Sequence, residues 1–208
     1  MKNILCFGDS NTWGYDYTTY DPALGSGRRM AFDERWPGIV QNMLGSEYRI
    51  IEDALNARTN MVEDPYFPHR LGLASLETAL DAQAPLDLVI IQMGVNELKH
   101  MFNMTAGMIS FGVEKLVAAA QASYYGYPAP KVLLIAPAPV RKNIADMIFG
   151  FSYVPWPTRR AFSWAHCTGM WLSGTAVRFW TVLRWISRST IWTACTTLKR
   201  ITPSWGRQ

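Results

Sequence analysis

Short apolar runs alternate with longer amphipathic segments over residues 1–150. The short runs predict buried strands, at 3–7, 48–52, 86–92 and 131–135. The run over 86–92 is almost continuously apolar, which is typical of a central parallel strand covered on both faces. Apolar positions at helical spacing predict helices between the strands, at 33–44, 73–83 and 104–124. Strands that alternate with helices in this way indicate an α/β fold with an open parallel sheet.

The segment 151–208 breaks this pattern. It contains no Asp or Glu, whereas residues 1–150 hold all 16 acidic residues and 12 of the 20 lysines and arginines. Seven of the nine tryptophans also lie in this segment, without a clear amphipathic period. We therefore divide the chain into a core over 1–150 and an atypical basic, Trp-rich tail over 151–208.

Composition argues against several classes of protein. Cys6, Cys167 and Cys195 show neither metal-ligand spacing nor a paired framework, so we expect no metal site and a reducing, cytoplasmic location. The chain begins directly on a predicted strand, so we expect no secretory signal. It has no run of about 18 uncharged apolar residues, so we expect no membrane-spanning helix. A nucleotide-binding protein is disfavoured and no cofactor is expected, because no Gly-x-Gly-x-x-Gly or P-loop follows a strand.

Three polar segments follow predicted strands. They are 8–11 after the first strand, 53–60 after the second and 94–97 after the third. The carboxyl ends of parallel strands meet at one edge of a sheet, which is where the sites of such folds lie. Ser10 is placed there as a nucleophile, and the amide of Asn96 can donate a hydrogen bond to a developing oxyanion. Plainer interpretations are a helix-capping serine and a loop asparagine.

Together these segments resemble the blocks of the SGNH/GDSL hydrolase superfamily. The stretch 8–14 (Gly-Asp-Ser-Asn-Thr-Trp-Gly) is similar to its first block, where Leu is usual at the position of Asn11. The stretch 53–59 is similar to the second block, and 86–99 to the third, where Gly-Thr-Asn-Asp-x-Lys is commoner. The stretch 127–139 also resembles a branch of cytoplasmic arylesterases and acyltransferases. The resemblance covers about residues 1–150.

This resemblance implies a three-layer α/β/α fold with flavodoxin-like strand order. It implies that Ser10 is the nucleophile, and that the oxyanion donors are the backbone N–H groups of Ser10 and Ala57 and the side chain of Asn96. Asp9, Asn11 and Trp13 are the candidate substrate-binding residues, although Trp13 fits the core equally well. Two departures from the superfamily are Ala57, where Gly is common, and Glu97 directly after Asn96.

The implied activity is that of a serine esterase. It would hydrolyse or transfer short acyl groups of small carboxylic, aryl or acetylated carbohydrate esters through an acyl-serine intermediate. The expected partners are a small-molecule ester and further copies of the chain in a homo-oligomer, and neither nucleic acid nor a membrane.

The base that Ser10 needs is missing from its usual place. In this superfamily it is a histidine near the C-terminus, in a pattern such as Asp-Gly-Val-His, but the tail has no Asp to orient His166. His69 follows a proline in a predicted surface loop, and His100 lies just beyond the third block. The alternative is therefore an inactive homologue or a non-catalytic interaction protein that uses its basic tail. Against an interaction role, the tail lacks an amphipathic period and any known binding-module pattern.

A shifted reading frame of the tail restores the missing motif. Read from the third base of each codon, Trp192-Thr193 must encode Asp, and the codons through Cys195 and the next residue permit Gly-Val-His. Upstream, 179–181 must encode Leu-Asp in the same frame. We hypothesise that the tail is an out-of-frame translation of an ordinary catalytic C-terminus, with the shift between Phe151 and Ala161.

Overall fold

Five parallel strands form the centre of the molecule. The computed structural model describes residues 1–122, 124–137, 152–153 and 177–181. In spatial order the strands are β4 (Tyr48–Ala54), β1 (Lys2–Gly8), β5 (Leu88–Gln92), β6 (Lys131–Ala136) and β7 (Val177–Thr181). Numbered along the chain, this order is 2-1-3-4-5, which is flavodoxin-like as expected. The four strands predicted from the sequence are confirmed as β1, β4, β5 and β6.

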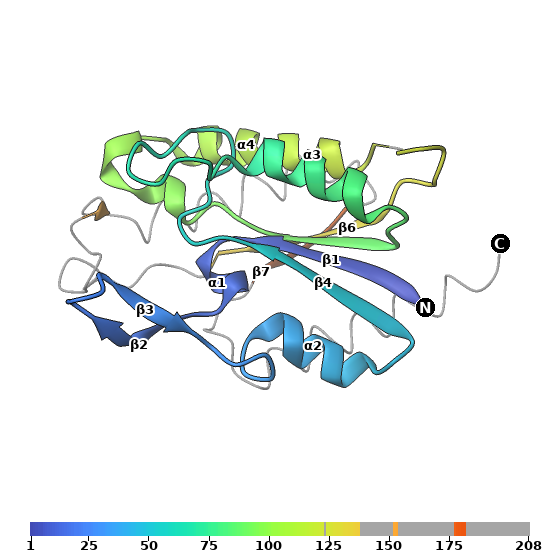
Figure 1. Ribbon diagram of the computed structural model, residues 1–208. Helices are drawn as coiled ribbons and strands as arrows, with labels where there is room; N and C mark the ends of the chain where they lie inside the picture. Colours follow the sequence, from blue (N-terminus) through green and yellow to red (C-terminus); the bar gives the residue numbers. More distant parts are fainter. Residues whose placement is uncertain (123, 138–151, 154–176, 182–208) are drawn as a thin grey trace.

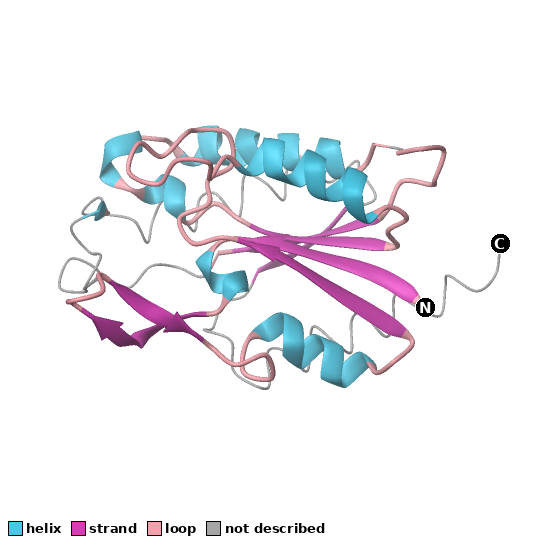
Figure 2. Cartoon of the chain, in the orientation of Figure 1, coloured by secondary structure: helices cyan, strands magenta, loops and turns pink. Residues whose placement is uncertain are grey.

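Helices cover both faces of this sheet, as the resemblance implied. Figures 1 and 2 show α3 (Gly72–Gln83) and α4 (Ala106–Ala120) side by side on one face, and α2 (Trp36–Leu44) on the other. The buried residues form two clusters accordingly. The larger lies between the sheet, α3 and α4, and the smaller lies between the sheet and α2.

The register brings three strand ends to the same level. Gly8, the last residue of β1, pairs with Ala54 of β4 on one side and with Gln92 of β5 on the other. The chain leaves β1, forms β4 beside it, and then returns to form β5 on the opposite side of β1. This reversal is the topological switch point at which parallel sheets bind their ligands. All three predicted blocks therefore leave the sheet at one edge.

The predicted helices exist, but several of their bounds differ in the structure. α2 begins at Trp36 rather than at 33, and Pro37 occupies its first turn, where a missing N–H costs nothing. It ends before Gly45, whose φ of 78° suits glycine. α4 begins after Thr105, whose hydroxyl accepts a hydrogen bond from the N–H of Met108. It ends at Ala120, four residues earlier than its apolar spacing predicted.

Several short elements were not predicted. They are the helix α1 (Ser10–Trp13), the 3-10 helices η1 (Asn96–Leu98) and η2 (His100–Phe102), and the antiparallel hairpin of β2 (Tyr15–Asp21) and β3 (Ser26–Arg29). The hairpin extends from the body beside α1 (Figure 1). The Tyr- and Thr-rich composition of β2 was the sequence signal for it.

Two short pieces of the tail join this layered body. β7 pairs in parallel with β6 along its whole length. Tyr153 forms a backbone bridge with Lys99 and packs against the larger core cluster.

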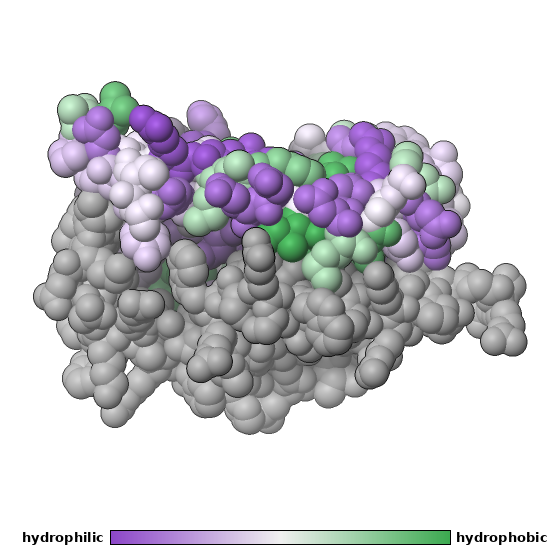
Figure 3. Space-filling view, turned by 90° about the horizontal axis from the view of Figure 1, so that it is seen from below, coloured by the Kyte–Doolittle hydropathy of each residue, from purple (hydrophilic) through white to green (hydrophobic). Residues whose placement is uncertain are grey.

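The described surface has a mixed character. Seen from below, hydrophilic residues predominate on it, with small hydrophobic patches between them (Figure 3). In the described part of the chain, no helix has both the length and the apolar character to cross a membrane.

Candidate functional site

Ser10 is the first residue of α1, and only Asp9 separates it from the end of β1 at Gly8. Asp9 is the N-cap of α1, and its Oδ1 accepts hydrogen bonds from the backbone N–H of Asn11 (2.9 Å) and from Asn11 Nδ2 (3.0 Å). Capping is therefore the task of Asp9, and the capping interpretation of Ser10 is wrong. Ser10 is half-buried, and its hydroxyl is not required by the helix.

Glycine is required at the end of β1. A Cβ on Gly8 would lie 2.0 Å from Thr12 Oγ1 and 2.9 Å from the carbonyl oxygen of Gln92. Thr12 itself donates a hydrogen bond to Gln92 Oε1 (3.0 Å), which also accepts one from Trp36 Nε1 (3.0 Å). One buried amide at the end of β5 thus holds α1 and α2 against β5, the strand that pairs with β1.

Ala57 has the backbone conformation that favours glycine. Its φ is 63°, in the left-handed region. The turn that contains it is held by the N–H of Leu55, which donates to the carbonyl of Gly8 (3.2 Å). This conformation gives a physical reason for the common glycine at this position in the superfamily.

Asn96 is fixed by the same loop. Its side chain is buried, and Nδ2 donates a hydrogen bond to the carbonyl oxygen of Arg58 (2.9 Å), the residue after Ala57. An amide nitrogen carries two hydrogens, so one remains for a substrate oxygen. The second and third blocks are therefore joined at the position where two of the three expected donors lie.

Arg58 is a site residue that the sequence did not reveal. Its side chain is only 2% exposed, although arginine is almost never buried without partners. Nη1 donates to the carbonyl oxygens of Gly8 (3.2 Å) and Asp53 (2.8 Å), and Nη2 binds Asp53 Oδ1 (2.7 Å). An arginine directly after Ala57 in the second block was the only signal in the sequence.

Two buried carboxyl groups, those of Asp9 and Glu97, belong to the first and third blocks. Glu97 Oε1 accepts a hydrogen bond from the backbone N–H of Asn60, so this departure from the superfamily fastens the third block to the second. Burial raises the pKa of Asp9 to about 6, and burial together with the charge of Asp9 raises the pKa of Glu97 to about 7. Burial and these two carboxyl groups also raise the pKa of Tyr153.

The candidate substrate-binding residues lie at the start of the first block. Asp9 is fully buried, Asn11 is exposed and Trp13 is half-buried. The ring of Trp13 contacts Tyr15, with 6.4 Å between centroids, and the guanidinium of Arg29 lies 5.1 Å from its centroid.

No base for Ser10 is visible in the described part of the chain. His69 and His100 are both exposed, and neither forms a hydrogen bond with Ser10 there. His166 and the expected C-terminal Asp and His positions lie outside the described residues. The described residues also contain no group of three His, Cys, Asp or Glu side chains able to hold a metal ion.

Comparisons with known proteins agree with this geometry. The profile of the GDSL-like Lipase/Acylhydrolase family matches residues 6–164. The structure is similar to an aryl esterase from M. smegmatis, with a TM-score of 0.84 and 30% identity over 96% of this chain and 99% of that one. It is also similar to a carbohydrate acetylesterase from Sinorhizobium meliloti, with a TM-score of 0.79 and 29% identity over 98% of this chain and 99% of that one.

A further similar structure is that of a protein from Agrobacterium tumefaciens that has been assigned as an arylesterase. The TM-score is 0.79, with 25% identity over 98% of this chain and 99% of that one. No curated protein sequence matches the chain significantly.

Proposed function

Because the chain belongs to the GDSL-like lipase/acylhydrolase family, we propose that it is a serine esterase acting on short acyl groups. Its substrates on this proposal are small carboxylic, aryl or acetylated carbohydrate esters. The similarity to an aryl esterase and to a carbohydrate acetylesterase supports this choice. Transfer of the acyl group to an alcohol instead of water is part of the same proposal.

The convergence of three strand-end loops carries the proposal. Gly8, Ala54 and Gln92 end their strands at one level, and Asn96 is bonded to the residue next to Ala57. In the proposed reaction Ser10 Oγ bonds to the ester carbonyl carbon, and its proton passes through a base to the departing alcohol. The carbonyl oxygen, negatively charged in the intermediate, is held by the N–H groups of Ser10 and Ala57 and by Asn96 Nδ2.

Water then cleaves the acyl-serine bond and releases the carboxylic acid. Asn11 and Trp13 are proposed to contact the substrate at the edge of the site. Asp9, which is buried, would affect the substrate only indirectly, by capping α1 and fixing Asn11.

The proposed base is the histidine that the shifted frame would encode. In that frame an aspartate spans the codons of Trp180 and Thr181, which form the end of β7. Thr181 pairs with Ala136, and Ile135 pairs with Gln92, so β7 ends at the same edge of the sheet as β1. Sequencing the gene after codon 150 tests this: bases that cannot encode Asp-Gly-Val-His in another frame would refute it.

The nucleophile is tested with p-nitrophenyl acetate. The wild-type chain is expected to hydrolyse it faster than Ser10→Ala, because alanine removes the oxygen and leaves the cap on Asp9 intact. Far-UV circular dichroism of both proteins controls for folding. Equal rates would show that Ser10 is not a working nucleophile in the chain with the tail over 151–208.

One observation favours a second candidate, an inactive homologue. It is the exposure of His69 and His100, the two histidines in the described part of the chain. A reactive fluorophosphonate separates the two candidates, because it bonds to an activated serine only. Intact-mass analysis should show one adduct, located on the peptide with Ser10. A chain that binds esters but forms no adduct would support the inactive homologue.

A further inference from the structure

We propose that Arg58 is a positioning residue for the oxyanion site, an inference that rests on the proposed function. Its guanidinium is buried, 4.3 Å from the ring centroid of Phe7. Its hydrogen bonds go to Gly8 and Asp53, the residues where β1 and β4 end. Arg58 thus spans the two strand ends from which the first and second blocks leave.

Three segments supply the proposed oxyanion donors, and each of them is linked to Arg58. We call these segments the three arms: the serine turn after Gly8, the backbone at Ala57 and the side chain of Asn96. One of the two carbonyl oxygens that Nη1 binds belongs to Gly8, two residues before Ser10. Ala57, with its left-handed backbone, directly precedes Arg58. The carbonyl oxygen of Arg58 accepts the hydrogen bond of Asn96. A shift of Arg58 would therefore move the serine turn, the Ala57 N–H and the Asn96 amide relative to one another.

The geometry explains why this residue is an arginine. A buried cation is unfavourable unless it is paired, and an apolar side chain would fill the same space without the free-energy cost of removing a charge from water. The planar fork, however, reaches two carbonyl oxygens and one carboxylate at once, with fixed angles between them. A lysine keeps the positive charge, but its single nitrogen cannot donate hydrogen bonds in the same fixed directions. The interaction with the carboxylate is a short ion pair of 2.7 Å to Asp53.

The test compares Arg58→Lys with a matched control, Arg35→Lys. Arg35 is also largely buried, and it also binds a carboxylate (Glu52) and a backbone carbonyl (Met30), but it contacts none of the three arms. With p-nitrophenyl acetate we expect Arg58→Lys to lower kcat by roughly 10- to 100-fold with KM within about twofold, because a small misplacement of catalytic donors has this effect. Arg35→Lys should keep kcat within about twofold.

Hydrogen–deuterium exchange gives a readout that does not need turnover. Amides of residues 55–60 should exchange at least about tenfold faster in Arg58→Lys than in the wild type, while β5 stays protected. Asp53→Asn keeps an acceptor but removes its charge. It should show the same changes to a smaller extent, and it takes the place of Arg58→Lys if that protein does not fold.

The outcomes separate this inference from the proposed function. If the wild type is no faster than Ser10→Ala, the proposed function fails for the chain with this tail. The exchange of residues 55–60 then decides alone whether Arg58 positions the site. If the wild type is active but Arg58→Lys keeps its kcat, or if exchange over 55–60 is unchanged, the positioning role is wrong. Equal losses of kcat in Arg58→Lys and Arg35→Lys would also overturn it, because general destabilisation would then be sufficient.

Discussion

At the scale of single residues, the site concentrates groups that are unfavourable elsewhere. Ala57 has a left-handed backbone, Arg58 is a buried cation, and Asp9 and Glu97 are buried acids. Asp9 Oδ2 and Glu97 Oε2 have no hydrogen-bond partner among the described residues. Such costs persist where the surrounding structure holds them in place, and they cluster at functional sites.

Glu97 should make the stability of the protein depend on pH. Its pKa is about 7 in the folded chain against 4.5 as the ordinary value, so folding favours its protonated form. Its contribution is therefore present below pH 4.5 and is lost as the pH rises towards 7, by roughly 3 kcal/mol at most. In Glu97→Gln, which still accepts the N–H of Asn60, the free energy of unfolding should fall less over this window.

Urea unfolding at pH 4.5 to 7.5 measures this difference. In Glu97→Gln the free energy of unfolding should still decline somewhat as the pH rises, because burial raises the pKa of Asp9 as well. Glu63→Gln changes an exposed glutamate in the loop that follows β4, and it serves as the control. Identical pH slopes for Glu97→Gln and the wild type would show that Glu97 does not titrate as described.

At the scale of elements, the contact of β1 with α1 decides where the serine lies. Gly8→Ala should test it. The added methyl group meets Thr12 Oγ1 and the backbone of Gln92, and the latter cannot move without disturbing the sheet. We expect a loss of roughly 1–3 kcal/mol in unfolding free energy, as for other overpacked sites.

The same variant should lose esterase activity through displacement of α1. Gly107→Ala is a suitable comparison, because its Cβ would meet only Thr105 Oγ1 at 3.9 Å and because, as at Gly8, its φ is not positive. It reports the effect of replacing glycine without a steric clash. If Gly8→Ala were as stable and as active as the wild type, close packing at this turn would not position Ser10.

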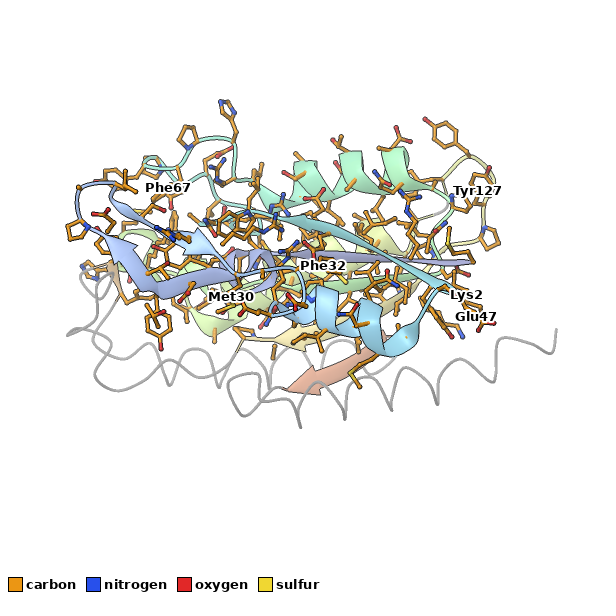
Figure 4. All side chains as sticks on the ribbon, turned by 60° about the horizontal axis from the view of Figure 1, so that its bottom comes forward. Lys2, Met30, Phe32, Glu47, Phe67 and Tyr127 are labelled. Atoms are coloured by element: carbon orange, nitrogen blue, oxygen red, sulfur yellow. The ribbon has the colours of Figure 1, made fainter. Side chains whose placement is uncertain are left out.

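At the scale of the whole molecule, the site occupies one end of the sheet. Figure 4 shows Phe67, from the loop that follows β4, at the end where the hairpin lies. Tyr127 lies at the opposite end with Lys2 and Glu47. Tyr127 lines a small apolar groove there with Leu80, Pro85, Tyr124 and Pro130. Homo-oligomer formation stays a prediction.

The tail provides the prediction at this scale. If the gene carries the shifted frame, the protein expressed from it should end in an Asp-Gly-Val-His segment. Its rate with p-nitrophenyl acetate should exceed that of the printed chain by about 10³-fold or more, because removing the base of a triad has at least that effect. Ser10→Ala in the restored frame should abolish the gain. No gain would mean that the tail is not what limits activity.

Much of the fold could be predicted because it follows from local patterns. The apolar run over 86–92 needed burial on both faces, and only a central strand between helices gives it that. Helix ends were less predictable. The apolar spacing of α4 continues past Ala120, but the chain turns there to reach β6, and tertiary contacts decide that point.

The sequence by itself determined the order of strands and helices, the family and the three polar segments at strand ends, because period, turn residues and short motifs are local properties of the chain. The tertiary structure decided that Asp9 is the cap rather than Ser10, that Ala57 has a left-handed backbone and that Glu97 reaches Asn60. It also brought the Arg58 side chain to the ends of β1 and β4, and its carbonyl oxygen to Asn96. These facts depend on the register between strands distant in sequence, which no local pattern contains.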